Sequence, residues 1–201
     1  MTMLIVATIG ALGLVLTGCA TDPQNPAEQS ISTQQGGSAN TAGDLLAAHG
    51  LDGLTGQEIV DKLDNLNQAE RPSSLFASVR ANSLVLTDGG AQEQVVALPE
   101  DEFYVSIAPF LTQTHECYFH SLTSCVGELQ NKDIQVRIVN DADGTVLVDE
   151  ATKTFDNGFI GYWLPKDITA TVEITHDGNT ATATLGTGPD DPTCVTTIQL
   201  A

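Results

Sequence analysis

Basic residues are scarce in this sequence of 201 residues. Seven Lys and Arg stand against 26 Asp and Glu, which gives a net charge of −19 at neutral pH. A surface of this sign repels nucleic acid and anionic lipid headgroups, and it attracts cations. The composition therefore argues against nucleic acid as a partner and against electrostatic binding to a membrane surface.

The common sequence signatures of enzymes are also missing. No Gly-rich phosphate loop follows a predicted strand, and no Ser-His-Asp set is recognisable. The sequence has no C-x-x-C pair, which disfavours both thiol-disulfide oxidoreductases and structural zinc sites. We therefore expect no catalytic residues and a protein that is not an enzyme.

The longest apolar run, from Leu4 to Leu16, is too short to span a membrane, which takes ~20 residues. It is followed by the letters TGC, and LTGC at 16–19 resembles the lipobox of bacterial lipoproteins, although no Lys or Arg precedes the run. These features predict a lipoprotein signal peptide at 1–18 and a lipidated Cys19. The polar residues that follow predict a disordered tether over 19–43.

Helical patterning begins at residue 44 and extends to about residue 81. Thr55 and Glu58 have the spacing of a capping box, and Ile59 and Leu63 follow on one helical face. Pro72 marks the expected end of the helix. We expect a short helical region within residues 44–100.

The remaining sequence indicates β structure, and residues 101–201 are expected to form a β-rich domain. Asp143-Gly144 and Asp177-Gly178 predict tight turns between strands, and the flanking residues alternate between apolar and polar. The predicted fold is α+β, with a mostly antiparallel β-sandwich after the helices. Strands are expected at 83–87, 95–98, 103–108, 134–139, 145–149, 159–164, 170–175, 181–185 and 195–200.

Cys117, Cys125 and Cys194 remain once the lipobox cysteine is assigned to lipid. Three is an odd number for an exported protein, in which cysteines usually pair. The three cysteines therefore allow two interpretations. One is a disulfide between any two of the three with one thiol left over, and the other is a metal site.

Residues 115–125 hold two of the four histidines and two of the four cysteines. If His115 and Cys117 lie on one strand, they share a face, and a turn near Ser121 returns Cys125 beside them. Cys194 is then the distant third ligand. Thiolates with imidazoles select Cu(I) or Zn(II), and thiolates favour Cu(I) most.

The letters HECYFHSLTSCVGEL at 115–129, preceded by IAPF at 107–110, closely resemble the motif of the CueP family of periplasmic copper-binding proteins. A looser resemblance runs from about residue 45 to the end of the chain. The three characteristic cysteines of the family map onto Cys117, Cys125 and Cys194. Its clustered histidines map onto His115 and His120.

This resemblance implies copper as the bound ion and a role in copper resistance in the cell envelope. It implies sequestration of Cu(I) and delivery to a client such as a copper-dependent superoxide dismutase. It also implies homodimerisation through residues 44–100 and copper binding by residues 101–201. Familiar members of the family are soluble in the periplasm, whereas this chain carries a predicted lipid anchor.

The site hypothesis is that Cys117, Cys125 and Cys194 bind Cu(I), with His115 or His120 completing the site. Because oxidation of two of these thiols removes metal affinity, a thiol-redox partner is expected as well. Zinc binding, or a disulfide-stabilised structural lipoprotein, are the alternatives. The expected location is the outer side of the cytoplasmic membrane or the periplasm, with the membrane reached through the lipid anchor only.

Overall fold

The computed structural model describes residues 42–90 and 93–201, which belong to one compact unit. The predicted signal peptide at 1–18, the lipidated Cys19 and nearly all of the predicted tether at 19–43 lie outside these residues. Among the residues described, no helix has the length and apolar character needed to cross a membrane.

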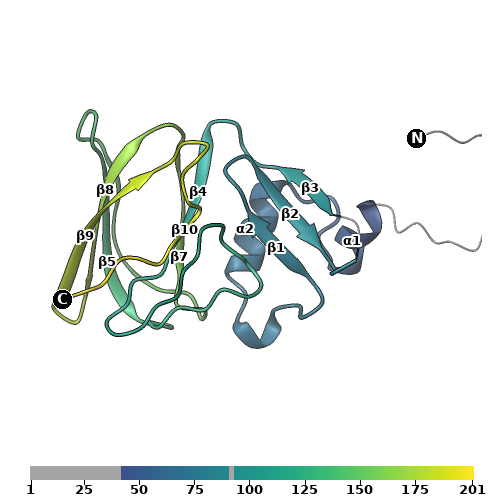
Figure 1. The fold of residues 1–201 in the computed structure, drawn as a ribbon, viewed down its shortest axis with the longest axis horizontal. Coiled ribbons are helices and arrows are strands. Elements are labelled where there is room, and N and C mark those ends of the chain that lie inside the picture. The colour runs from purple at the N-terminus through teal and green to yellow at the C-terminus, as the bar shows by residue number, and fades with distance from the viewer. Residues whose placement is uncertain (1–41, 91–92) are drawn as a thin grey trace, which may run out of the picture. The chain divides into compact units, whose positions relative to one another are not determined.

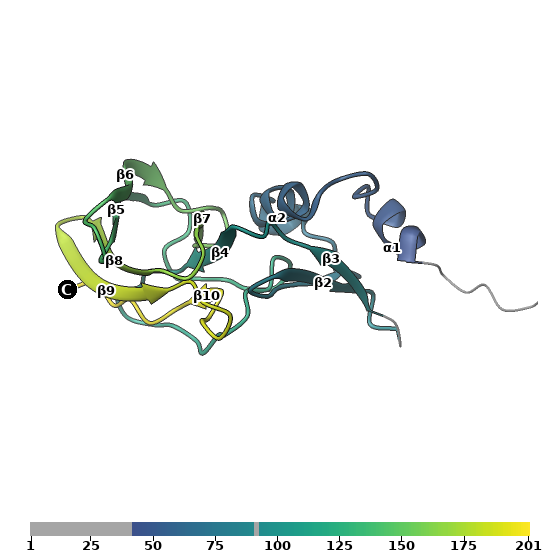
Figure 2. The ribbon, with the colours of Figure 1, turned by 90° about the horizontal axis from the view of Figure 1, so that it is seen from above.

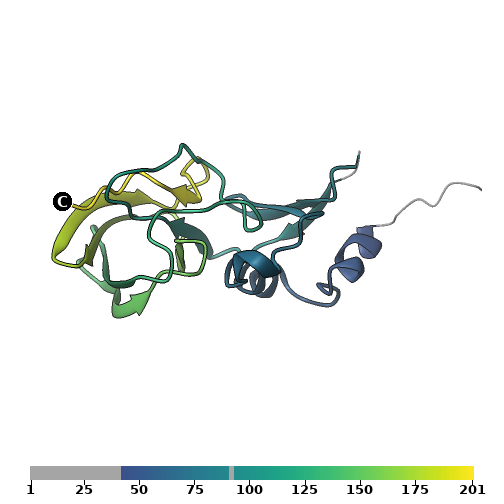
Figure 3. The same ribbon diagram turned by 90° about the horizontal axis from the view of Figure 1, so that it is seen from below.

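The first half of the unit packs helices against a small sheet. Helix α2 starts at the predicted capping box, in which Glu58 N–H donates to Thr55 Oγ1 at 3.3 Å and Thr55 N–H donates to Glu58 Oε2 at 2.8 Å. Its buried face, with Ile59 and Leu63, packs with one face of the sheet (Figures 2 and 3). The elements are α1 (Ala42–Ala48), α2 (Gly56–Asp64), the 3-10 helix η1 (Gln68–Glu70), β1 (Phe76–Val79), β2 (Ser83–Thr87) and β3 (Gln94–Ala97), with strand order β1-β2-β3.

Strand β1 corrects the expectation that helical structure runs to about residue 81. Residues 76–79 pair antiparallel with β2, with Ala77 opposite Leu86 and Val79 opposite Leu84. Ala77 and Val79 are buried in the core while Phe76 and Ser78 are not, which is the period of two of a strand. Pro72 separates this strand from the helical segment, so the apolar residues beyond it follow a different period.

The second half is a β-sandwich, and the predicted α+β class is confirmed (Figure 1). One sheet has the order β10-β4-β7, and the other has the order β6-β5-β8-β9. All pairings between strands in this half are antiparallel except the short parallel pair of β10 and β4, and an isolated parallel bridge joins Phe110 and Gln199. The strands are β4 (Glu102–Ile107), β5 (Asp133–Asn140), β6 (Val146–Lys153), β7 (Ile160–Pro165), β8 (Thr169–His176), β9 (Asn179–Gly186) and β10 (Cys194–Val195).

Both predicted hairpin turns are present. Asp177 and Gly178 have φ values of 48° and 83°, the pair of positive angles that a two-residue hairpin turn requires. Gly144 has φ of 72° in the turn between β5 and β6. The turns fix the register in which Val136 and Ile138 face the sandwich core.

The last strand is shorter than predicted. Strand β10 ends at Val195, whereas the apolar alternation predicted a strand over 195–200. Ile198 and Leu200 are nevertheless buried, because the chain there pairs with Phe110: Phe110 N–H donates to Ile198 O at 3.0 Å and Leu200 N–H donates to Phe110 O at 2.8 Å. The apolar alternation therefore reflects the burial of Ile198 and Leu200, whose segment packs beside the loop after β4 and is not a regular strand.

Three buried clusters result. One fills the sandwich, and a second lies between α2 and the β1-β2-β3 sheet. The third is small and consists of Ala108, Cys125, Phe159 and Cys194, with Cys117 packed against it. The predicted cysteines therefore gather in one place in the folded chain.

Candidate metal centre

The motif at 115–125 lies on the long loop between β4 and β5, and the expectation that His115 and Cys117 share a strand is wrong. A few backbone hydrogen bonds hold this loop to different segments. Val79 N–H donates to His120 O at 2.8 Å and Leu122 N–H donates to Ala77 O at 2.9 Å, which forms an isolated antiparallel bridge to β1. Cys194 N–H donates to Tyr118 O at 3.1 Å. Because the backbone partners are scattered, no ladder forms, yet the loop is fixed between β1 and β10.

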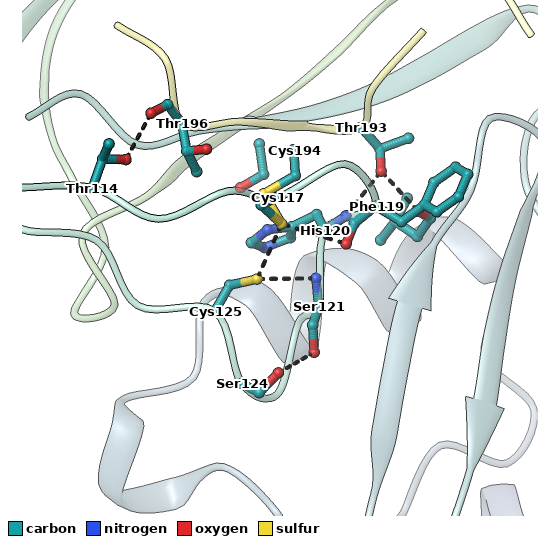
Figure 4. The surroundings of a disulfide bond; sticks show 12 residues. Thr114, Cys117, Phe119, His120, Ser121, Ser124, Cys125, Thr193, Cys194 and Thr196 are labelled. Atoms are coloured by element: carbon teal, nitrogen blue, oxygen red, sulfur yellow. Dashed lines mark hydrogen bonds between the residues drawn. A yellow bond between two sulfur atoms is a disulfide. The ribbon is translucent and has the colours of Figure 1, made fainter. Parts of the chain in front are cut away.

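The predicted turn after Ser121 is present and returns Cys125 toward Cys117. Cys125 N–H donates to Ser121 O at 3.1 Å, and Leu122 is fully buried within the turn. Ser121 N–H in turn donates to Cys125 Sγ at 3.4 Å. Figure 4 shows the resulting loop, with the Cys125 sulfur directed at the Cys117–Cys194 pair.

Of the disulfide pairings that the sequence leaves open, the structure forms Cys117–Cys194, with a Cα–Cα distance of 5.7 Å. Cys125 keeps a buried thiol with no disulfide partner in the described part of the chain. Its sulfur lies 3.6 Å from Cys117 Sγ. All three cysteines of the motif are thus in contact range, two as a disulfide and one as a thiol.

The two histidines of the motif each group with two of the sulfurs. The exposed His115 groups with Cys117 and Cys125, and the buried His120 groups with Cys125 and Cys194. In each group the potential ligand atoms lie within 4.8 Å of one another. The five residues predicted from the sequence are therefore brought together, with one imidazole open to solvent and one closed off.

His120 is fully buried and has one ring nitrogen without a partner. Its Nε2 lies 2.9 Å from Asp64 Oδ1. Its Nδ1 finds no hydrogen-bond partner among residues 42–90 and 93–201. The ring also packs on Phe159, with centroids 4.7 Å apart. A buried nitrogen that is left unpaired costs stability, so the unpaired Nδ1 fits the role of a ligand atom.

The charges around Cys125 favour a thiolate. Burial alone would lower the pKa of His120, but the adjacent Asp64 carboxylate raises it to about 9. Burial raises the pKa of the Cys125 thiol, yet the His120 ring and the Ser121 N–H outweigh that effect and bring the pKa below its ordinary value. A thiol poised next to an imidazolium is a ready metal ligand, and metal then displaces the remaining protons.

Sequence reasoning missed two residues of this centre, Asp64 and Arg71. Asp64 is fully buried at the end of α2. Arg71, nearly buried, lies with its Nη2 3.9 Å from Asp64 Oδ1 and donates from Nη1 to Cys125 O at 2.8 Å. The available signal was the position of Asp64 four residues after the buried Val60, which places a carboxylate on the apolar face of the helix.

Two surface hollows reach the centre. One of about 240 Å³ is lined by His115, Gly127 and Glu128 together with neighbouring loop residues. The other, of about 350 Å³, has Cys117 and Cys194 in its wall beside the exposed Tyr118. The first opens beside the exposed imidazole, and the second opens beside the disulfide.

Comparison with known proteins agrees with this geometry. The family model described as "Periplasmic copper-binding protein CueP" matches residues 58–199. A solved structure described as the crystal structure of S.CueP has 38% sequence identity to the chain and a TM-score of 0.75. The alignment covers 82% of this chain and 100% of that one, and no curated protein sequence matches. The chain therefore belongs to the CueP family of periplasmic copper-binding proteins.

Proposed function

We propose that this chain sequesters Cu(I) in the cell envelope through the thiolates of Cys117, Cys125 and Cys194. The observation that carries the proposal is that the three cysteine sulfurs lie together beside the buried His120. A ring nitrogen of His120 lies within 4.8 Å of two of these sulfurs, and its Nδ1 has no hydrogen-bond partner in the described part of the chain. Soft sulfur and nitrogen donors prefer Cu(I) to hard cations. His120 completes the site from inside, and the exposed His115 receives the ion from solvent.

Binding in this form requires the reduced protein, because a disulfide supplies no thiolate. A dithiol reductant converts Cys117–Cys194 into two thiols and becomes a disulfide itself, so that two electrons and two protons balance. The hollow that has Cys117 and the buried Cys194 in its wall, next to Tyr118, supports access of such a redox partner. Copper then displaces the thiol protons.

The cellular role that we propose is copper resistance, by sequestration of the ion and its delivery to a client such as a copper-dependent superoxide dismutase. The lowered pKa of Cys125 and the net charge of −19 both favour capture of a cation. Capture and transfer of an ion require no catalytic turnover. The chain acts in this proposal as a binding protein, without enzymatic activity.

We also propose that Cys19 carries a lipid and tethers the domain to the envelope membrane, on the basis of the LTGC lipobox. The domain then faces the periplasm or the outer side of the cytoplasmic membrane. Homodimerisation through residues 44–100 is part of the same proposal. Phe76 and Val95, which are 53% and 59% exposed, alternate with the residues that pack toward α2 and leave that face of the small sheet partly apolar.

A competition titration tests the copper proposal. The reduced protein should withdraw one Cu(I) per chain from a chromogenic Cu(I) chelator, and zinc should not displace it. The oxidised protein should bind far more weakly, and so should reduced Cys125→Ser, which keeps the Cys117 and Cys194 thiols. Undiminished binding by a variant with all three cysteines changed to Ser, or no binding by the reduced wild type, contradicts the proposal.

The observed disulfide supports one competing function, a structural protein that is stapled by Cys117–Cys194. That function gives the Cys125 thiol and the unpartnered His120 nitrogen no role. It predicts that the reduced protein has no preference for Cu(I) over other ions. The same titration therefore separates the two functions.

A further inference from the structure

Asp64 stands where stability alone would not place a carboxylate. It is fully buried, and it is the last residue of α2, where the helix dipole disfavours negative charge. On the apolar face of an amphipathic helix, a hydrophobic side chain normally occupies such a position. A residue that breaks two local rules at once points to a role beyond folding.

The surroundings of Asp64 hold its carboxylate in one orientation. Tyr104 Oη donates to Oδ2 at 2.6 Å, and Ser106 Oγ donates to Oδ2 at 3.1 Å. Asn157 Nδ2 donates to Oδ1 at 3.1 Å, and Oδ1 is also in contact with His120 Nε2. These donors come from β4 and from the loop before β7. The second half of the domain therefore fixes a carboxylate that the first half supplies.

This contact decides which nitrogen of His120 is available. An ionised carboxylate only accepts hydrogen bonds, so the nitrogen facing it must carry a proton. In the neutral ring the other nitrogen, Nδ1, then has the free lone pair. That atom is buried without a partner among the described residues. A ring nitrogen of His120 lies within 4.8 Å of the Cys125 and Cys194 sulfurs.

We propose that Asp64 is the positioning residue of the centre: it keeps the proton on His120 Nε2 and thereby presents the Nδ1 lone pair to the cysteine sulfurs. This inference rests on the proposed copper site. Carboxylates that hold metal-binding histidines in this way typically contribute about 10–100-fold to metal affinity. The effect reaches the ion through His120, because Asp64 itself is not a ligand.

The test uses Asp64→Asn, whose amide fills the same space and can donate to Nε2. Nitrogen-15 NMR of the reduced, metal-free protein at alkaline pH, where the His120 ring is neutral, should show the proton on Nε2 in the wild type. In Asp64→Asn it should move to Nδ1. Cu(I) affinity measured at that same pH, so that proton competition at the ring does not enter, should fall about 10–100-fold.

The matched control is Tyr104→Phe, which removes another hydrogen bond to the same carboxylate and leaves the contact with His120. It should keep the proton on Nε2 and the affinity within a few-fold of the wild type. If Asp64→Asn does not fold, the wild type still provides a test, since NMR of its Cu(I)-loaded form identifies the metal-bound nitrogen.

Binding through Nε2, or an Asp64→Asn variant with wild-type proton position and affinity, overturns the inference. Failure of the copper proposal looks different, because the reduced wild type then binds no Cu(I). In that case the ring measurement on the metal-free protein still decides whether Asp64 sets the proton position of His120.

Discussion

Reduction of the Cys117–Cys194 disulfide should lower the free energy of unfolding substantially. The bond joins cysteines that are 77 residues apart in the sequence. In the chain-entropy description, closing a loop of this length stabilises the folded state by about 4.5 kcal/mol. For a domain of this size the midpoint of thermal unfolding should fall by roughly 9–18 °C.

Copper should restore the stability that reduction removes, because the ion joins the same two cysteines and binds Cys125 as well. A ligand at a free concentration 1,000 times its dissociation constant stabilises the native state by about 4 kcal/mol. Cu(I) buffered at that level should therefore return the reduced protein close to the stability of the disulfide form. The disulfide and the ion act as alternative cross-links at one place in the fold.

Thermal unfolding followed by circular dichroism tests this on the oxidised, the reduced and the reduced, Cu(I)-loaded protein. Cys125→Ser is the matched control because it keeps the disulfide. On reduction its midpoint of unfolding should fall as much as that of the wild type, but copper should raise the midpoint less. Equal midpoints for the oxidised and reduced wild type would refute the reasoning about the disulfide. Full restoration of Cys125→Ser by copper would refute the reasoning about the ion.

Two further predictions concern the walls of the centre. The Thr112 side chain and the N–H groups of residues 111–113 hold the pKa of Glu128 at about 2, so its stabilising contribution is complete above the ordinary value of 4.5 and is lost as the pH falls through about 2. Glu128→Gln should flatten the dependence of the urea midpoint on pH in that window, and an unchanged slope would contradict this. Phe159→Ala, at a fully buried side chain against the His120 ring, should cost about 3–5 kcal/mol in urea unfolding. Phe159→Leu, which keeps most of the buried volume, should cost less, and equal losses would contradict lost buried volume as the cause.

The strands of the sandwich could be predicted because local signals agree there. Val136 and Ile138 alternate with polar residues, and the Asp-Gly pairs at 143–144 and 177–178 end the strands where the structure ends them. The capping box at Thr55 likewise starts α2. In each case the residues that decide the element lie within a few positions of it.

For the centre itself, only the candidate ligands could be predicted from the sequence. His115 and Cys117 have the spacing of a strand, but the backbone of their loop forms hydrogen bonds with β1 and β10, which lie far away in the sequence. Asp64 and Arg71 are more than 40 positions from the motif and take their roles from contacts that only the fold creates. The pairing of Cys117 with Cys194, left open by the sequence, is fixed in the same way.

X-ray absorption at the copper edge of the reduced, Cu(I)-loaded protein tests the central claim most directly, since it reports the atoms bound to the ion. We expect a first shell of thiolate sulfur with an imidazole nitrogen, and the nitrogen contribution should disappear in His120→Ala while the sulfur remains. A first shell of oxygen or nitrogen without sulfur would contradict the assignment of Cys117, Cys125 and Cys194 as the copper ligands.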